Sequence, residues 1–314
     1  MDYQVLAFYL LNPIEEPQKE VKRFQDFFAS HDVMGRIYIN EEGINAQMSI
    51  HEKDAEAFYE WYLGDERFKE TDIKVHRFDT HAFPKKTVKY RKQLVALDQE
   101  VDFSKTGKHA CAKEWKAMLN ENDPNTVILD VRNDYEWEVG HFEGAEKPNF
   151  KNFREFPESV KELTKDHAPG KTRVLMYCTG GIRCELYSCL LKEEGYDEVY
   201  QLDGGVIKYG LEEGNDHWKG KLFVFDDRLV VPISEDQTDT VGTCHHCETP
   251  IDACYNCANM KCNALFLCCQ SCYESNLGCC SSPCMEAPTR REAKSTDRPR
   301  PFRKLPFEEK QKYR

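Results

Sequence analysis

Eleven cysteines lie between Cys244 and Cys284, within 41 residues. Three pairs of them have the C-x-x-C spacing, which lets two thiolates bind one metal ion while the intervening N–H groups point at the sulfurs. The segment contains too few apolar residues to fold by burial alone, so we expect metal binding to supply the missing stability. The spacing therefore predicts a small unit that is held together by structural zinc.

The cysteine spacing favours two zinc sites with four thiolates each. The two predicted ligand sets are Cys244, Cys247, Cys269 and Cys272, and Cys257, Cys262, Cys280 and Cys284. At the sequence level this pairing stays open, because Cys254, Cys268 and Cys279 are left over. The alternatives are an iron–sulfur cluster, unliganded reduced thiols, or a ligand contributed by His245 or His246.

The chain contains 15 cysteines in all, and its N-terminus lacks the basic segment of a secretory signal. Such cysteine usage is typical of thiol or metal chemistry in a reducing compartment, so we expect a cytoplasmic protein without disulfides. No apolar run approaches the roughly 18 residues that would span a bilayer. No membrane partner is therefore predicted.

Residues 1–98 are predicted to form an α+β domain. Strands are expected over 3–11, 35–40, 43–50 and 73–78, and helices over 17–31 and 52–64. The first helix is indicated by apolar residues at helical spacing, among them Phe24, Phe27 and Phe28. The short segment between the second and third strands is typical of a hairpin. The order βαββαβ is that of the ferredoxin-like fold.

Residues 99–220 alternate short apolar strands with helices. Strands are expected at 126–131, 173–178 and 198–205, and helices at 112–120 and 184–195. Alternation of this kind predicts a parallel sheet that is covered by helices. Residues 221–314 make up the third predicted unit, the cysteine-rich segment with a basic tail. The predicted fold class is thus α/β, with a ferredoxin-like domain in front and a zinc-binding segment behind.

The octapeptide YCTGGIRC, residues 177–184, joins the end of a predicted strand to a helix. In such an arrangement several backbone N–H groups point inward and form an anion-binding nest. The partial positive charge at the helix N-terminus favours the thiolate of Cys178. Arg183 adds a fixed positive charge. The octapeptide predicts a nucleophilic Cys178 in an anion cradle, and the alternative is a buried structural cysteine before a turn.

Two further segments resemble rhodanese motifs. LDVRNDYEWEVGHFEGA at 129–145 resembles the rhodanese signature, and LDGG at 202–205 resembles the closing motif. The resemblance implies a single rhodanese domain at 99–220 in which Cys178 forms a persulfide or is otherwise reactive. The predicted catalytic residues are Cys178 and Arg183, in a loop with Thr179, Gly180, Gly181, Ile182 and Cys184, supported by Asp130, Arg132 and His141.

Two of these residues have competing interpretations. Cys184 either resolves an oxidised Cys178 or is a small residue that fills a tight helix start. His141 is either a catalytic base or a tie between its loop and backbone groups, and we favour the tie.

GRIYINEEGINAQMS at 35–49, YCTGGIRCE at 177–185 and the cysteine cluster together resemble the bacterial tRNA uridine hydroxylase family. Members of that family are rhodanese-like and install 5-hydroxyuridine at the wobble position of tRNA with molecular oxygen. The resemblance implies an enzyme of this activity with an essential Cys178, tRNA as partner and oxygen as co-substrate. Two alternatives stay open: a sulfurtransferase that carries a persulfide on Cys178, and a non-catalytic adaptor built from zinc and rhodanese units.

The net charge of −12 argues against wholesale coating of nucleic acid, but two stretches are basic. Residues 85–92 hold five basic residues and no acid, and residues 289–314 hold ten Lys or Arg against four Asp or Glu. A tRNA partner needs such charges for its phosphates, and Tyr90 is a candidate for stacking on a base; the alternative is a solvated charged face. The predicted RNA-binding residues are Lys85, Lys86, Lys89, Arg91 and Lys92. No DNA partner is expected, and the sequence does not indicate the oligomeric state.

Overall fold

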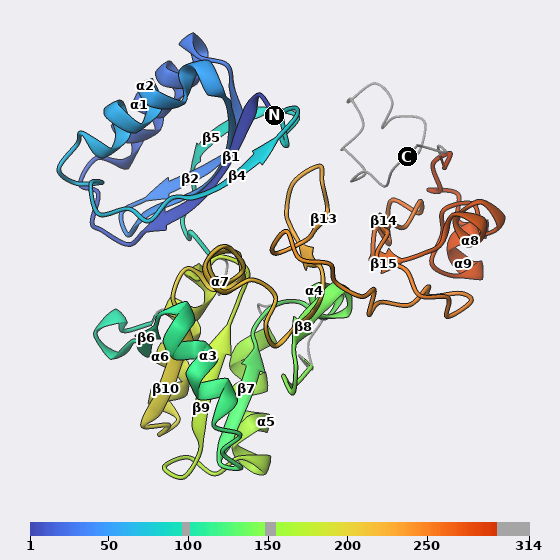
Figure 1. The fold of residues 1–314 in the computed structure, drawn as a ribbon. Helices are drawn as coiled ribbons and strands as arrows, with labels where there is room; N and C mark the ends of the chain where they lie inside the picture. The colour runs from blue at the N-terminus through green and yellow to red at the C-terminus, as the bar shows by residue number, and fades with distance from the viewer. Residues whose placement is uncertain (96–100, 148–154, 294–314) are drawn as a thin grey trace.

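The fold, given by a computed structural model, is described over residues 1–95, 101–147 and 155–293. It consists of an N-terminal α+β domain, a central parallel sheet with helices on both faces, and a C-terminal cysteine-rich unit (Figure 1). The predicted fold class is confirmed. Within the described residues, no helix is both long and apolar enough to cross a membrane.

The N-terminal sheet has the strand order β4-β1-β3-β2-β5. Its strands are β1 (Tyr3–Leu10), β2 (Val33–Asn40), β3 (Gly43–His51), β4 (Lys74–Phe78) and β5 (Lys86–Tyr90). The first four strands pair antiparallel in the ferredoxin-like arrangement, and β5 pairs parallel with β2. The sequence does not predict β5, because only Val88 in it is buried and cations dominate its pattern.

Two helices, α1 (Pro17–Ser30) and α2 (Glu52–Leu63), cover one face of this sheet (Figure 1). Apolar side chains alternate along β2 and β3, so that Ile37 and Ala46 pack against Phe24 and Phe58 of the helices. The opposite face carries the intervening, more polar residues of the same strands. That face is turned toward the central domain, where it forms one wall of a cavity.

The central sheet has the order β6-β10-β9-β7, and all of its strands are parallel. Its strands are β6 (Lys108–Ala110), β7 (Thr126–Asp130), β9 (Arg173–Tyr177) and β10 (Glu198–Leu202), preceded by the 3-10 turn η1 (Phe103–Lys105). Side chains on β9 alternate between two cores: Val174 and Met176 face one layer, and Leu175 and Tyr177 face the other. Such two-sided burial is typical of a parallel sheet between helices.

Helices lie on both faces of the central sheet. One layer contains α5 (Phe156–Asp166) and α6 (Ile182–Glu193), and the other contains α3 (Ala112–Asn120) and α7 (Gly205–Glu213). The short helix α4 (Asp134–Val139) follows β7 directly. The sequence pattern predicts α3 and most of α6, but it does not predict α4, α5 or α7. Helix α7 begins at Gly205, the last residue of the LDGG motif.

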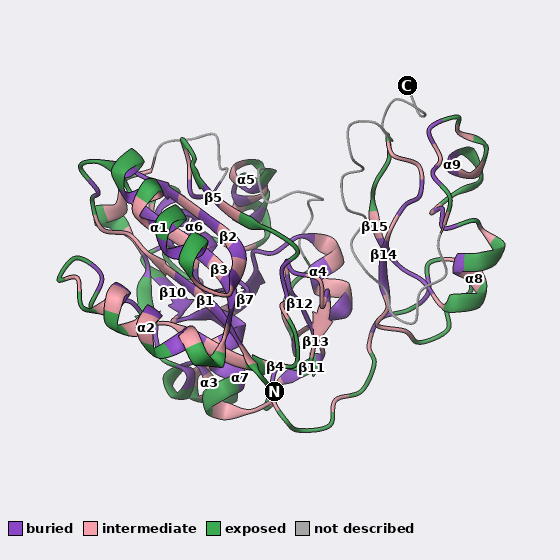
Figure 2. Cartoon of the chain, turned by 90° about the horizontal axis from the view of Figure 1, so that it is seen from above, coloured by how far each residue is buried: buried purple, intermediate pink, exposed green. Residues whose placement is uncertain are grey.

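The C-terminal third is built from short elements. The first of them, β11 (Trp218–Gly220), pairs antiparallel with β8 (Gly140–Phe142), which follows α4 in the central domain. Next come the antiparallel pair β12 (Leu222–Phe223) and β13 (Val230–Val231), the antiparallel pair β14 (Cys254–Asn256) and β15 (Leu265–Leu267), and the short helices α8 (Gln270–Ser275) and α9 (Ser282–Glu286). A largely exposed segment leads from β13 to the cysteine-rich unit (Figure 2). Cys254 and Leu267 of that unit pack against Val139 at the end of α4.

Candidate active site and metal centres

Cys178 follows β9 directly and lies in the loop that leads to α6. The N–H of Gly181 donates to its Sγ over 3.1 Å. On the other side of the loop, the N–H groups of Val206 and Ile207 in the first turn of α7 donate to the carbonyls of Cys178 and Thr179, over 3.0 and 3.1 Å. Because these carbonyls are held by α7, the N–H groups of the loop are free to point at the sulfur, as the predicted nest requires.

Glycine is required at two positions around this loop. Gly181 has a φ of +103°, and a Cβ there would lie 2.9 Å from the hydroxyl of Tyr9. Gly205, in the LDGG motif, has a φ of +68°, and a Cβ there would lie 2.6 Å from the carbonyl oxygen of Cys178. A side chain at either position would therefore push the loop away from α7 or from β1.

The Cys178 thiol is 1% exposed, and several groups act on its pKa. Burial opposes the charged form, but a hydrogen bond from the Cys184 thiol, the charge of Arg183 and backbone N–H groups lower the pKa to about 5. Burial and the neighbouring Cys178 raise the pKa of Cys184 instead. At neutral pH Cys178 is therefore a thiolate, and Cys184 is the thiol that donates to it.

Arg183 is held by a buried carboxylate. Its Nη1 and Nη2 donate to the two carboxylate oxygens of Glu136, over 2.8 and 2.9 Å, and Nη2 also donates to Thr179 Oγ1 over 3.1 Å. Glu136 is fully buried and caps α4 through the N–H of Asn133. The guanidinium is thus fixed beside the loop, where it contributes its charge to Cys178.

The residues named as supporting form a second buried pair behind β7 and β9. Asp130 and Arg132 are fully buried, and Arg132 donates both to Asp130 and, over 2.6 Å, to the carbonyl of Gly140. Tyr177, next to Cys178 in the chain, donates to Asp130 over 2.8 Å. His141 lies at hydrogen-bond distance, 2.9 Å, from the carbonyl of Trp137 and stacks on its ring. Each of these contacts joins elements of the fold to one another.

A cavity of about 560 Å³ separates the Cys178 loop from the N-terminal sheet. One wall is formed by the loop: Cys178, Thr179, Gly180, Ile182 and Arg183. The facing wall is formed by the sheet: Ala7, Tyr9, Arg36, Tyr38, Asn45 and Gln47. A cavity of this size holds one nucleotide-sized ligand, so a base bound in it would lie between the sheet and the thiolate.

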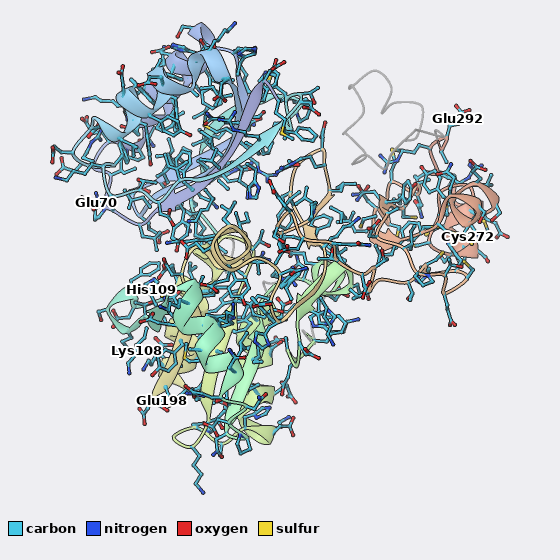
Figure 3. The ribbon with its side chains drawn as sticks, in the orientation of Figure 1. Glu70, Lys108, His109, Glu198, Cys272 and Glu292 are labelled. Carbon is cyan, nitrogen blue, oxygen red and sulfur yellow. The ribbon has the colours of Figure 1, made fainter. Side chains whose placement is uncertain are left out.

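Eight cysteines of the C-terminal unit form two groups, in the same two sets that the spacing predicts. They are Cys244, Cys247, Cys269 and Cys272, and Cys257, Cys262, Cys280 and Cys284, with the sulfurs of each group within 4.8 Å of one another. The Cys247–Cys269 and Cys262–Cys280 sulfur distances are 3.7 Å. Tetrahedral zinc with bonds of about 2.3 Å needs sulfurs about 3.8 Å apart, so both groups fit this ion. Cys272 lies on α8 (Figure 3).

The two histidines between Cys244 and Cys247 connect the groups. Nε2 of His245 lies 3.0 Å from the carbonyl of Cys280, and Nε2 of His246 lies 3.0 Å from the carbonyl of Cys279. Neither histidine belongs to the two groups, whose members among the described residues are all cysteines, so thiolates are the candidate ligands. The three left-over cysteines, Cys254, Cys268 and Cys279, are buried in apolar clusters.

Comparison with known proteins covers nearly the whole chain. Residues 3–94 match the UPF0176 acylphosphatase-like domain, residues 112–212 the rhodanese-like domain, and residues 219–285 the rhodanese C-terminal domain. A protein of Protochlamydia amoebophila named tRNA uridine(34) hydroxylase is 52% identical over 96% of this chain and 93% of its own length. Proteins with the same name from Chlamydia abortus and Chlamydia trachomatis serovar D are 50% and 49% identical, over 97% and 96% of this chain and 93% of their own lengths.

The chain belongs to the tRNA uridine(34) hydroxylase family. Of the five predicted RNA-binding residues in this family member, only Arg91 lines the cavity. Lys85, Lys86, Lys89 and Lys92 are exposed along β5 and its ends, and Lys86 donates to the carbonyls of Phe28 and His31. Tyr90 is 38% exposed and donates to Glu41.

The basic tail begins inside the cysteine-rich unit of this tRNA uridine(34) hydroxylase relative. Thr289 Oγ1 donates to Asn259 over 2.6 Å, and Arg291 donates to the carbonyl of Cys257 and to Asn263. Residues 289–291 therefore pack onto the cysteine-rich unit. Residues 294–314, which carry most of the predicted positive charge, lie outside the described residues.

Several cavity residues of this family member are not predicted from the sequence. Arg36, Tyr38, Asn45 and Gln47 occupy alternate positions on β2 and β3, opposite the apolar residues of the core. That alternation is visible in the sequence, but nothing in it shows what the polar face meets. Tyr9 and Glu185, which join the two domains, are likewise missed because 176 residues separate them.

Proposed function

We propose that this chain hydroxylates C5 of the wobble uridine of tRNA, with molecular oxygen as co-substrate. The observation that carries this proposal is that relatives about 50% identical over nearly the whole chain share the name tRNA uridine(34) hydroxylase. The cavity supports it, because its volume suits one nucleotide and its inner wall presents a thiolate.

Each part of the loop has a role in this proposal. Cys178 is the catalytic residue: its thiolate adds to C6 of uracil and makes C5 nucleophilic toward oxygen, and loss of the C5 proton with release of the thiolate then restores the C5–C6 double bond. One atom of O2 stays on C5 as the hydroxyl, and the other leaves as water with two electrons from a cellular two-electron reductant. Arg183 acts through its charge on that thiolate and through its bond to Glu136. Thr179, Gly180, Gly181 and Ile182 shape the loop, Cys184 donates to the sulfur, and Asp130, Arg132 and His141 hold the strands behind it.

We further propose that both cysteine groups bind structural zinc and that tRNA contacts the exposed cations around β5. Zinc bound at the two groups would supply the folding free energy that this small unit lacks. A tRNA substrate and reduced, metal-binding thiols favour the cytoplasm as the site of action.

A sulfurtransferase is the second candidate, because a thiolate with a lowered pKa in a rhodanese-type loop is also suited to carry a persulfide. A non-catalytic adaptor is disfavoured by the same feature, since an adaptor has no use for a buried thiolate that opens on a nucleotide-sized cavity.

Nucleoside mass spectrometry of tRNA tests the proposal. In a strain that lacks this gene and any parallel hydroxylation pathway, the wild-type gene should restore 5-hydroxyuridine, and Cys178→Ser should not. Cys111→Ser, at an exposed thiol outside the cavity, is the control and should restore it. Undiminished 5-hydroxyuridine with Cys178→Ser, or sulfur transfer from thiosulfate to cyanide without any hydroxylation, would refute the hydroxylase.

A further inference from the structure

Two amide side chains line the cavity from neighbouring positions on one face of β3. Ile44, Ala46 and Met48 point into the core and are at most 1% exposed. Since side chains alternate along a strand, Asn45 and Gln47 point to the opposite face, which is the cavity wall opposite Cys178. Both amides are half-buried.

The neighbouring strands β1 and β2 each place a tyrosine beside Asn45. Asn45 pairs in register with Tyr9 of β1 and with Tyr38 of β2. Strands are about 4.8 Å apart, so the backbones of these two tyrosines are about 10 Å apart across β3, and both side chains line the cavity on either side of Asn45. The guanidinium of Arg91 lies over Tyr38, 5.1 Å from the ring centroid.

The hydrogen bonds within this wall fix the orientation of both amides. Nη2 of Arg36 donates to Oε1 of Gln47 over 2.8 Å. Because a guanidinium only donates, Nε2 of Gln47 is left as a donor, and it has no partner among the described residues. Nδ2 of Asn45 donates to the carbonyl of Leu94 over 3.4 Å. Oδ1 of Asn45 is left as an acceptor, likewise without a partner in the described ranges.

We infer that Asn45 and Gln47 recognise the base edge of uracil and exclude cytosine. This inference rests on the proposed function. The N3–H of uracil donates to Oδ1 of Asn45, and O4 accepts from Nε2 of Gln47. Cytosine has an acceptor at N3 and an amino group at C4, so both contacts become repulsive. The ring lies between Tyr9 and Tyr38, which is the usual way in which proteins hold an unpaired RNA base.

Binding of anticodon stem-loop RNA under anaerobic conditions tests this without turnover. Wild-type protein should bind RNA with uridine at the wobble position about tenfold to a hundredfold more tightly than RNA with cytidine there, the range expected for two specific contacts. RNA with 3-methyluridine at that position, which lacks the N3–H, should be weakened to a similar degree. Equal affinity for the three RNAs, or no detectable binding of any of them, would overturn the inference even if no variant were made.

Two variants assign the discrimination to these side chains. Gln47→Glu replaces the donor by an acceptor and should bring the cytidine-to-uridine ratio of dissociation constants to about one or below. Asn45→Leu removes the acceptor and should abolish the penalty for 3-methyluridine. Gln25→Glu adds the same charge on α1, outside the cavity, and should keep the wild-type ratio. Ratios that stay at the wild-type value in Gln47→Glu and Asn45→Leu would assign recognition elsewhere.

The cellular hydroxylation assay separates this inference from the proposed function. Hydroxylation together with equal binding of uridine and cytidine RNA would leave the hydroxylase intact and reject the base-edge contacts. Discrimination by Asn45 and Gln47 without hydroxylation would support base recognition and reject the chemistry.

Discussion

The hydroxyl of Tyr9 donates to Oε1 of Glu185 over 2.8 Å, across 176 residues of chain. Tyr9 belongs to the N-terminal sheet and Glu185 to α6 of the central domain. The same carboxylate accepts from Nε2 of His109 over 2.9 Å and from Gln201 over 3.2 Å. One buried carboxylate thus joins the two walls of the cavity, and His109, labelled in Figure 3, couples that junction to pH.

We expect the stability of the protein to depend on the charge of His109. Its hydrogen bond with Glu185 raises the pKa of His109 above the ordinary value of 6.5. A raised histidine pKa contributes stability that is fully present below pH 6.5 and is lost as the pH rises through the raised value. The melting temperature of wild-type protein should therefore fall more between pH 6 and 8 than that of His109→Gln. Parallel curves for the two proteins would contradict this coupling.

Alkylation should reveal the Cys178 thiolate at low pH. Because the pKa is lowered to about 5, the rate of Cys178 modification by iodoacetamide should rise near that pH and level off by pH 7. Peptide mass spectrometry follows the site directly. Cys184→Ala removes one hydrogen bond to the thiolate and should move the midpoint upward. A wild-type midpoint near the free-thiol value of about 8.5 would indicate a structural cysteine.

The Glu136–Arg183 pair should be important for stability. Glu136→Gln leaves a buried guanidinium without its charged partner, so we expect a loss of about 3–5 kcal/mol in the free energy of unfolding. Glu138→Gln is the matched control in the same helix. Its side chain is 42% exposed and pairs with an exposed Lys147, so its effect should be within about 0.5 kcal/mol. Urea denaturation measures both, and similar losses in the two variants would reject the pair as a stabilising contact.

Metal analysis should find about two zinc ions per chain, as two Cys₄ sites require. Cys262→Ser removes a ligand from one group only and should lower the zinc content to about one. Cys254→Ala removes a thiol that packs in a separate apolar cluster, so it should keep both ions. Wild-type protein that folds without zinc, or a loss of zinc in Cys254→Ala alone, would show that the ligand sets are wrong.

The exposed lysines near β5 should control the salt dependence of tRNA binding. Lys85→Ala with Lys89→Ala should flatten the log–log slope of affinity against salt by about 0.7 to 0.9 for each phosphate that the variant no longer neutralises. Lys19→Ala, on the exposed side of α1, is a control that removes the same kind of charge. Deletion of residues 294–314 should have a larger effect, because that segment has eight Lys or Arg against three Asp or Glu. Unchanged slopes in both cases would assign phosphate binding to other residues.

The order from β1 to α2 follows from the sequence because each helix and strand there buries an apolar pattern of its own, whereas β5 buries only Val88 and is not predicted. The set Cys244, Cys247, Cys269 and Cys272 could be predicted for a similar reason, since each of its two C-x-x-C pairs fixes two ligands locally. The other set has no such pair, and Cys254, which has C-x-x-C spacing with Cys257, packs in a separate cluster. The cavity could not be predicted, because its walls come from β1–β3 and from the Cys178 loop, and their docking depends on contacts such as Tyr9–Glu185. The contact between Glu136 and Arg183 could be predicted only in part. Both residues lie in recognisable motifs, but the sequence does not show that the two motifs meet.

The alternation along β3 has a consequence for folding errors. If β3 paired with its neighbours one residue out of register, Ile44, Ala46 and Met48 would face the cavity, and Asn45 and Gln47 would enter the core. A misfolded chain of this kind would bury two amides without partners and would be penalised by several kcal/mol. Asn45 and Gln47 therefore also disfavour the wrong strand register, because a chain in that register is less stable than the native fold.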